Sequence, residues 1–148
     1  AMAKNINANA NVDLFGVVAK DMKDIWITDA EEGQPLIYVN KDLKIKQKLI
    51  KQDPKLLLTI LPAAFRDFLR KFLISGRVEH EDEWAIAWMR FAEKFTDEEP
   101  YPKKIDDNIE EVEKWIEKFS ENYTYEILEK KFNLKEKYKR EEQKIWAK

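Results

Sequence analysis

The sequence predicts a mainly α-helical bundle with a small N-terminal β-hairpin. Two features of its composition favour long, salt-bridged helices: charged residues make up 38% of the 148 positions, and only 3 residues are glycine. The third observation is positional. The β-forming runs lie in the first 40 residues, and apolar residues at helical spacing fill the rest of the chain. A chain of this length is expected to bury one hydrophobic core.

The N-terminal part predicts a tail followed by one hairpin. Residues 1–12 are polar and irregular, so we expect a disordered tail ahead of a single helical domain over residues 13–148. Residues 13–23 suit a short helix or an irregular segment. Residues 25–28 and 36–39 are rich in β-formers and flank the turn-like EEGQP, which predicts a strand pair. This pair resembles the one that opens PAS sensor domains, but no further strands are predicted to complete such a sheet.

Helical spacing dominates after residue 40. The helix over 82–94 has apolar residues around most of its circumference, which predicts a central position. Proline inside a helical pattern predicts a restart or a kink, here at Pro62. The other expected helices cover residues 41–51, 54–61, 62 to a stop at Gly76, and 134–146.

Two tyrosines stand at a predicted helix boundary. Asp106 or Asp107 can cap a helix that residues 120–122 are expected to end, which leaves Tyr123 and Tyr125 just before a short helix to residue 132. Two interpretations remain open for these rings. They are ordinary core residues, or they are presented to a ligand, where an aromatic ring can stack on a base.

The charges are distributed unevenly along the chain. Residues 41–77 contain ten lysines and arginines against three aspartates, whereas residues 78–113 contain four basic and thirteen acidic residues. The two stretches would attract each other if they pack together. Alternatively, the basic side chains converge on one surface that faces phosphates. The residues of that patch would be Lys44, Lys46, Lys48, Lys51, Arg66, Arg70, Lys71 and Arg77.

Several kinds of chemistry are excluded by residue type. The chain has no cysteine, which excludes disulfides, thiolate zinc sites and cysteine-ligated iron–sulfur clusters. It has one histidine, His80, and lacks the GxGxxG, P-loop, nucleophile-elbow and HExxH patterns. The acidic run at 79–83 is typical of a helix N-terminus, where the helix dipole favours acids, so no metal site is predicted. We therefore expect a protein that is not catalytic by itself.

The apolar runs are short. None approaches the roughly 20 residues that span a bilayer, and the N-terminus lacks the apolar region of a signal peptide. These features predict a cytoplasmic protein without a membrane partner.

Three segments resemble the C-terminal domain of the large, non-catalytic subunit of archaeal and eukaryotic primases. LPAAFRDFLRKFL (61–73) is similar to that domain's Phe-Pro-Pro-Cys-x-x-x-Leu helix start, with Ala64 in place of the cysteine. The apolar EWAIAWMRFAEKF (83–95) follows at a similar distance. IEEVEKWIEKFSENYTYEILEKKF (109–132) is similar to a family helix that ends in Trp or Phe and precedes Tyr-x-Tyr. Without cysteines, the chain most resembles the small third archaeal primase subunit or the helical bundle of plasmid primases, with no iron–sulfur cluster.

The resemblance implies an accessory role in DNA replication. The chain would bind the initiating ribonucleoside triphosphate, as a Mg²⁺ complex, and single-stranded DNA template, and it would support primer synthesis with the catalytic and large primase subunits as partners. Arg66, Arg70 and Arg77 would contact phosphates, His80 the triphosphate, and Tyr123 and Tyr125 a base or ribose. The alternative is a helical protein–protein interaction module, of viral origin for example, that binds no nucleotide.

Overall fold

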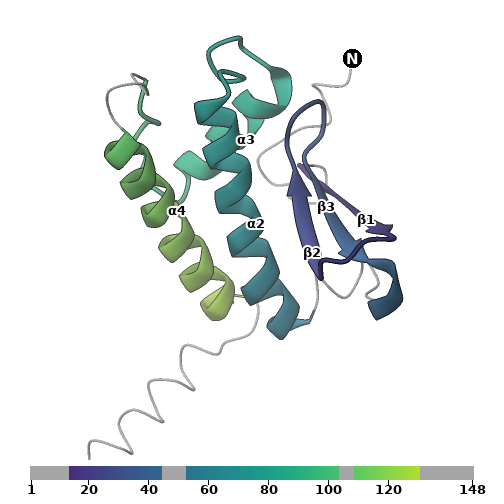
Figure 1. Cartoon of the computed structure of the whole chain (residues 1–148). Helices are drawn as coiled ribbons and strands as arrows, with labels where there is room; N and C mark the ends of the chain where they lie inside the picture. The colour runs from purple at the N-terminus through teal and green to yellow at the C-terminus, as the bar shows by residue number, and fades with distance from the viewer. Residues whose placement is uncertain (1–13, 45–52, 104–108, 131–148) are drawn as a thin grey trace, which may run out of the picture.

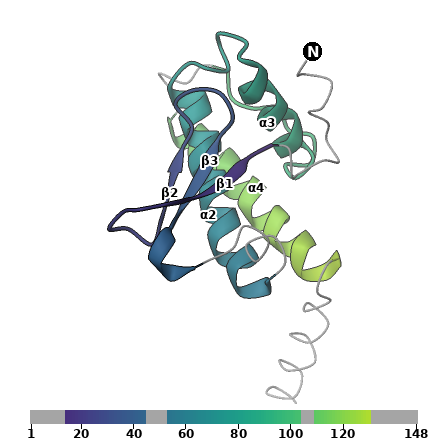
Figure 2. The same cartoon turned by 90° about the vertical axis from the view of Figure 1, so that its right-hand side faces the viewer.

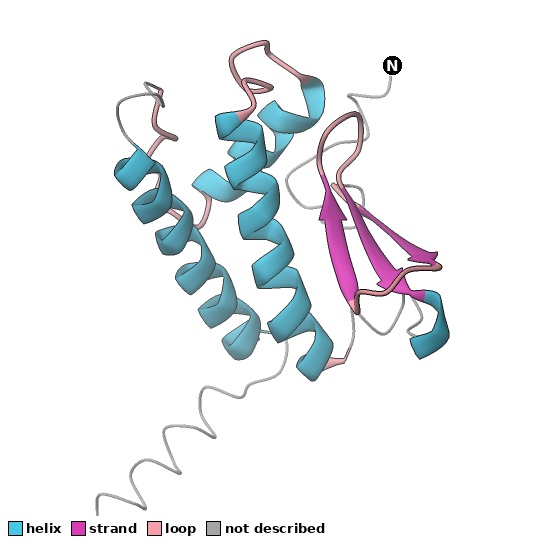
Figure 3. Ribbon diagram, viewed as in Figure 1, coloured by secondary structure: helices cyan, strands magenta, loops and turns pink. Residues whose placement is uncertain are grey.

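The computed structural model describes residues 14–44, 53–103 and 109–130. Three strands, β1 (Gly16–Lys20), β2 (Trp26–Asp29) and β3 (Leu36–Asn40), form one sheet in the order β1-β3-β2. Strand β3 is followed by the short 3-10 helix η3 (Lys41–Leu43). The remaining elements are the helices α2 (Pro54–Ile74), α3 (Glu83–Glu93) and α4 (Ile109–Lys130). Figure 3 shows the strands gathered at one side of the helices.

The fold is therefore a helix-rich mixed α/β arrangement and not a bundle with only a hairpin. The predicted hairpin is confirmed, because β2 and β3 pair antiparallel with Ile27 opposite Tyr38. The third strand, β1, was not predicted, since residues 13–23 were expected to be a short helix or irregular. It pairs parallel with β3, with Val18 opposite Tyr38, and this partner lies 20 residues away. Local spacing carries no signal for such a distant pairing.

Helix α2 lies between the sheet and α4, and α4 runs beside it in the opposite direction (Figure 1). Figure 2, viewed from the side of the sheet, shows β3 between β2 and β1 in front of α2. The predicted restart of the helix at Pro62 is wrong, because α2 is continuous through it, and the alternative, a kink, stays a prediction. Proline at this position donates no hydrogen bond to the preceding turn. The buried side chains of Leu61, Ala64 and Phe65 hold the helix together there.

Helix α4 is also continuous, so the predicted end at 120–122 is wrong. The Asn122 side chain does not compete for the backbone of its own helix, because its Nδ2 donates to the Phe95 carbonyl at 2.6 Å. Apolar residues continue at helical spacing through this region, which gives the helix one buried face. Those residues are Val112, Ile116, Phe119, Tyr123 and Ile127. Tyr123 and Tyr125 consequently lie within α4 and on different faces of it.

The core is aromatic and joins all parts of the described chain. Trp88 of α3 is fully buried, with its ring centroid 4.8 Å from that of Phe65 in α2, and its indole N–H donates to the Leu14 carbonyl at 2.8 Å. Asp82 caps α3 by accepting from the backbone N–H groups of Trp84 and Ala85. The predicted helix over 82–94 is confirmed.

Several predictions fall outside the described residues. They are the disordered tail over 1–12, the helix over 134–146, most of the helix over 41–51, and the positions of Lys46, Lys48 and Lys51. Among the described residues, no helix has both the length and the apolar character to cross a membrane.

The continuity of α4 predicts opposite outcomes for its two tyrosines. Tyr123 is 3% exposed and Tyr125 is 47% exposed. We expect Tyr123→Ala to lower the free energy of unfolding by about 3 to 5 kcal/mol, because it opens a cavity in the core. The matched Tyr125→Ala should change it by less than about 1 kcal/mol. Urea unfolding followed by circular dichroism measures both, and equal losses would contradict the assignment of faces.

Candidate binding surface

The sheet has one face packed on the helices and one face turned away from them. Successive side chains of a strand point to opposite faces. Val17, Ile37 and Val39 are buried on the inner face. The Asn40 N–H donates to the Ile25 carbonyl at 2.9 Å, which extends the β2–β3 pairing by one residue. The other face, which we name the outer sheet face, consists of Val18, Ile25, Ile27, Leu36 and Tyr38 with Lys20, Asp29 and Asn40 at its ends.

The outer sheet face is apolar and incompletely covered. Val18 and Ile27 lie opposite Tyr38 on its two sides, so the three side chains form a row across the strands. Val18 is 39% exposed and Ile25 is 64% exposed. The central strand carries LIYV, with apolar residues on both faces. A continuous apolar run is typical of strands buried on both faces, yet among the described residues the helices cover one face of this sheet and leave the other open.

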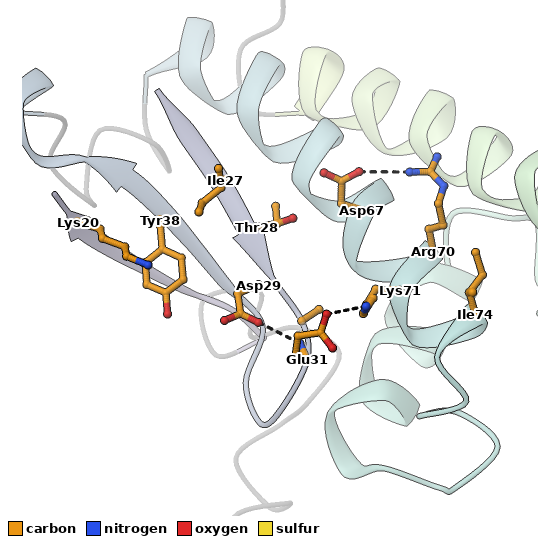
Figure 4. Close-up of a pocket in the computed structure, with 11 residues that line it drawn as sticks. Lys20, Ile27, Thr28, Asp29, Glu31, Tyr38, Asp67, Arg70, Lys71 and Ile74 are labelled. Atoms are coloured by element: carbon orange, nitrogen blue, oxygen red, sulfur yellow. Dashed lines mark hydrogen bonds and ion pairs between the residues drawn. The ribbon is translucent and has the colours of Figure 1, made fainter. Parts of the chain in front are cut away.

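A cleft lies where the outer sheet face meets α2 (Figure 4). Its volume is about 490 Å³, which is within the range of ligand-binding pockets. The sheet contributes Ile27 and Tyr38 to the lining, and α2 contributes Arg70, Lys71 and Ile74. The cleft therefore extends the apolar surface of the sheet toward the end of α2, where Ile74 is 54% exposed.

The charges along α2 in this cleft are matched internally. The Lys71 ammonium lies 2.6 Å from the Glu31 carboxylate, and Arg70 Nη1 lies 3.2 Å from Asp67 Oδ1. On the sheet side, by contrast, Lys20 and Asp29 take part in no ion pair within the described part of the chain. The Lys20 ammonium lies 4.7 Å from the centre of the Tyr38 ring, a cation–π contact.

Arg70 also forms a bidentate pair with Glu113. Its Nε and Nη2 donate to the two carboxylate oxygens at 2.7 and 3.0 Å. The hydrogen bond from Arg70 lowers the pKa of the Glu113 carboxyl. The pair therefore stabilises the fold above the ordinary glutamate pKa and loses this effect as the pH falls below it. Internal attraction between the basic and acidic stretches is confirmed at Arg70, whose guanidinium is occupied rather than open to a phosphate.

Arg77 is a buried structural residue. Its Nη1 donates to the Ala30 carbonyl at 2.7 Å, and its Nη2 donates to the Gly33 carbonyl and to Asp82 Oδ1, both at 2.9 Å. The guanidinium carbon lies 4.8 Å from the centre of the Phe72 ring. Arg77 therefore ties the β2–β3 loop to the residue that caps α3. This corrects the expectation that Arg77 contacts a phosphate.

Tyr123 is likewise a core residue. Its ring stacks on Phe119, with the centroids 5.6 Å apart and the planes at 15°, and it contacts Phe65 of α2 at 5.2 Å. Burial raises the pKa of the Tyr123 hydroxyl above its ordinary value. A ring enclosed in this way offers no face to a base, which corrects the expectation for Tyr123.

The other three residues predicted to bind nucleotide or DNA are exposed: Arg66, His80 and Tyr125. They do not all gather at one place. His80 follows the C-terminal end of α2, whereas Tyr125 is near the end of α4 that lies beside the start of α2 (Figure 1). At a rise of about 1.5 Å per residue along the helices, the positions of His80 and Tyr125 are roughly 20 Å apart. A nucleotide contact by any of the three stays a prediction.

Arg77 and Arg66 form a matched pair for testing the structural assignment. Arg77→Ala removes the donor to the Ala30 and Gly33 carbonyls and the cation beside Asp82, so we expect a loss of about 3 kcal/mol in unfolding free energy. Arg66→Ala removes an exposed guanidinium and should change it by less than about 0.5 kcal/mol. Urea unfolding midpoints at constant m-value decide the matter. A small loss in both variants would contradict the proposed tie between the loop and α3.

The unbroken LIYV run is the signal in the sequence for the outer sheet face, because it places apolar residues on both faces of β3. The acidic run at 79–83 supplies the α3 cap, Asp82. Within the described ranges, no three His, Asp or Glu side chains gather as ligands for a metal ion.

Comparisons with protein-family models, with curated proteins and with solved structures find no match to this chain.

Proposed function

We propose that the chain is a non-catalytic interaction module whose outer sheet face, with the adjoining cleft, binds a protein partner. One observation carries this proposal. The central strand is apolar on both faces, and the described part of the chain packs against only one of them. Covering apolar surface contributes about 25 cal/mol per Å², so the exposed row gives a partner a driving force for binding.

The shape of the surface favours a protein over a small molecule. Pockets for small ligands enclose most of the ligand surface. Here the apolar residues are spread over three strands and continue along α2 to Ile74, so a small ligand in the cleft would leave Val18 and Ile25 uncovered. A second protein surface can cover the whole region. A central apolar area with charges at its edge is the usual composition of such interfaces.

The charged groups support a role in binding rather than in catalysis. Arg70 and Lys71 are neutralised by carboxylates of the same chain, and Arg77 is bonded to the β2–β3 loop. These contacts hold the edges of the cleft in place and leave the apolar row as its open part.

Site-specific photo-crosslinking tests the proposal. A benzophenone amino acid at position 25, on the outer sheet face, should form a protein adduct in cells that express the chain naturally, and the same group at position 117 on α4 should not. Tyr38→Lys should remove the adduct. With the captured partner purified, the same substitution should weaken binding by about tenfold or more in calorimetry, because it puts a charge in the centre of the interface.

Two controls make this outcome decisive. Circular dichroism of Tyr38→Lys should show a folded chain, because Tyr38 lies on the outer face and is not part of the buried core. Equal adducts from positions 25 and 117, or an adduct that survives Tyr38→Lys, would reject the outer sheet face as the binding surface.

Nucleotide binding by an accessory primase subunit is a separate proposal that rests on the resemblance. Fluorescence anisotropy of labelled ATP with Mg²⁺, and of a short single-stranded DNA, measures it directly. If it holds, Arg66→Ala and Tyr125→Ala should each weaken binding by about fivefold or more, since a phosphate contact or a stacked base is lost. Arg90→Ala, an exposed arginine on α3, is the matched control. Absence of binding, even with the catalytic and large primase subunits present, would exclude this role.

A further inference from the structure

We infer that the outer sheet face binds a second copy of this chain, in a twofold dimer that places Lys20 of one protomer against Asp29 of its partner. The inference rests on the proposed function, because it names the partner of the same surface. It is carried by the positions of these two charges relative to the apolar row.

Lys20 and Asp29 lie at opposite ends of the outer sheet face. Lys20 is opposite Asn40, at one end of β3, and Asp29 is opposite Leu36, at the other end. Four residue steps along β3, from Leu36 to Asn40, separate these levels by roughly 13 Å. Tyr38 lies midway, between Val18 and Ile27.

A twofold axis fits this arrangement. Because Lys20 is on β1 and Asp29 on β2, the two outer strands, they lie at diagonal corners of the face. A twofold axis that passes over Tyr38, perpendicular to the line from Lys20 to Asp29, puts Lys20 over the partner's Asp29, and symmetry forms the same ion pair twice. The strands of the two copies then cross at a steep angle, as in orthogonally packed sheets. The apolar rows meet in the middle, as the inner faces of two packed sheets do.

Lys20 and Asp29 form no ion pair among the described residues, which points to an ion-pair partner on another chain. Arg70, Lys71 and Lys118 each have a carboxylate of the same chain within 4.0 Å. Lys20 contacts the Tyr38 ring, and Asp29 Oδ1 accepts the backbone N–H of Glu31 at 3.0 Å. The second Asp29 oxygen and the Lys20 ammonium can therefore complete their contacts across the interface.

The interface is small, which sets the expected affinity. Three strands of four or five residues cover roughly 14 by 16 Å. This area is less than the roughly 800 Å² per partner of a standard interface. The flank of α2 with Ile74 adds to this area. We expect a reversible dimer with a dissociation constant of roughly micromolar order or weaker.

Charge exchange tests the inference with purified protein. Sedimentation velocity up to roughly 1 mM protein at low salt should show the mass approaching that of a dimer. Lys20→Asp and Asp29→Lys should each weaken self-association by about tenfold or more, because each leaves like charges face to face. A mixture of the two variants should regain dimers, since every contact then joins opposite charges. Arg90→Asp, which makes the same change of charge on α3, should have no effect.

The outcomes separate this inference from the proposed function. If the unmodified chain stays monomeric at the highest concentration, a second copy is not the partner, and an adduct from position 25 that depends on Tyr38 would then indicate a different protein. If the chain dimerises but the mixture of variants does not regain dimers, the dimer uses another surface and the inference is overturned. Circular dichroism of both charge variants confirms that they remain folded.

Discussion

The fold depends on the burial of one aromatic ring, that of Phe65 in α2. Its ring contacts aromatic rings from the N-terminal segment, α3 and α4, and the centroid distances to Phe15, Trp88 and Tyr123 are 5.3, 4.8 and 5.2 Å. Edge-on packing of such rings stabilises more than area alone predicts. Because these contacts come from every layer, they fix which face of the sheet points inward. The outer sheet face is the consequence, since the same packing turns Tyr38 and Val18 away from the helices.

Arg77 adds a second constraint at the upper end of α2. A lysine at this position would present one ammonium, whereas the planar guanidinium reaches two loop carbonyls and the Asp82 carboxylate together while lying over Phe72. The loop between β2 and β3 is thereby attached to the helical layer. The cleft beside α2 keeps its width for this reason, and the Lys71–Glu31 pair closes one side of it.

Much of the secondary structure could be predicted from local patterns. The hairpin follows from β-formers around EEGQP, and α3 follows from Asp82 and the apolar residues behind it. The failures share a cause, because each depends on residues distant in sequence. Strand β1 forms because β3 offers it a parallel edge. Helix α2 passes through Pro62, and α4 passes through Asn122, because tertiary packing and the bond to Phe95 outweigh local preference.

The candidate site was less accessible to sequence reasoning. The basic stretch suggested phosphate contacts, but a count of charges does not say which are paired, and Arg70 and Arg77 find their acceptors 43 and 47 residues away. The LIYV run was visible, yet its meaning required knowing which face the helices cover. The placement of Lys20 diagonally across the sheet from Asp29 depends on β1, the strand that local patterns did not predict.

The charges at the ends of the outer sheet face also limit how that face can associate. An exposed apolar sheet face favours association in many orientations, including open, repeating ones. If the twofold axis ran along the line from Lys20 to Asp29, Lys20 would face Lys20 and Asp29 would face Asp29. Like charges in contact disfavour that arrangement. An axis perpendicular to that line brings opposite charges together at both ends of the face, so the contact closes on itself and does not propagate. An apolar surface of this kind can persist in a folded protein because its own end charges select one closed arrangement.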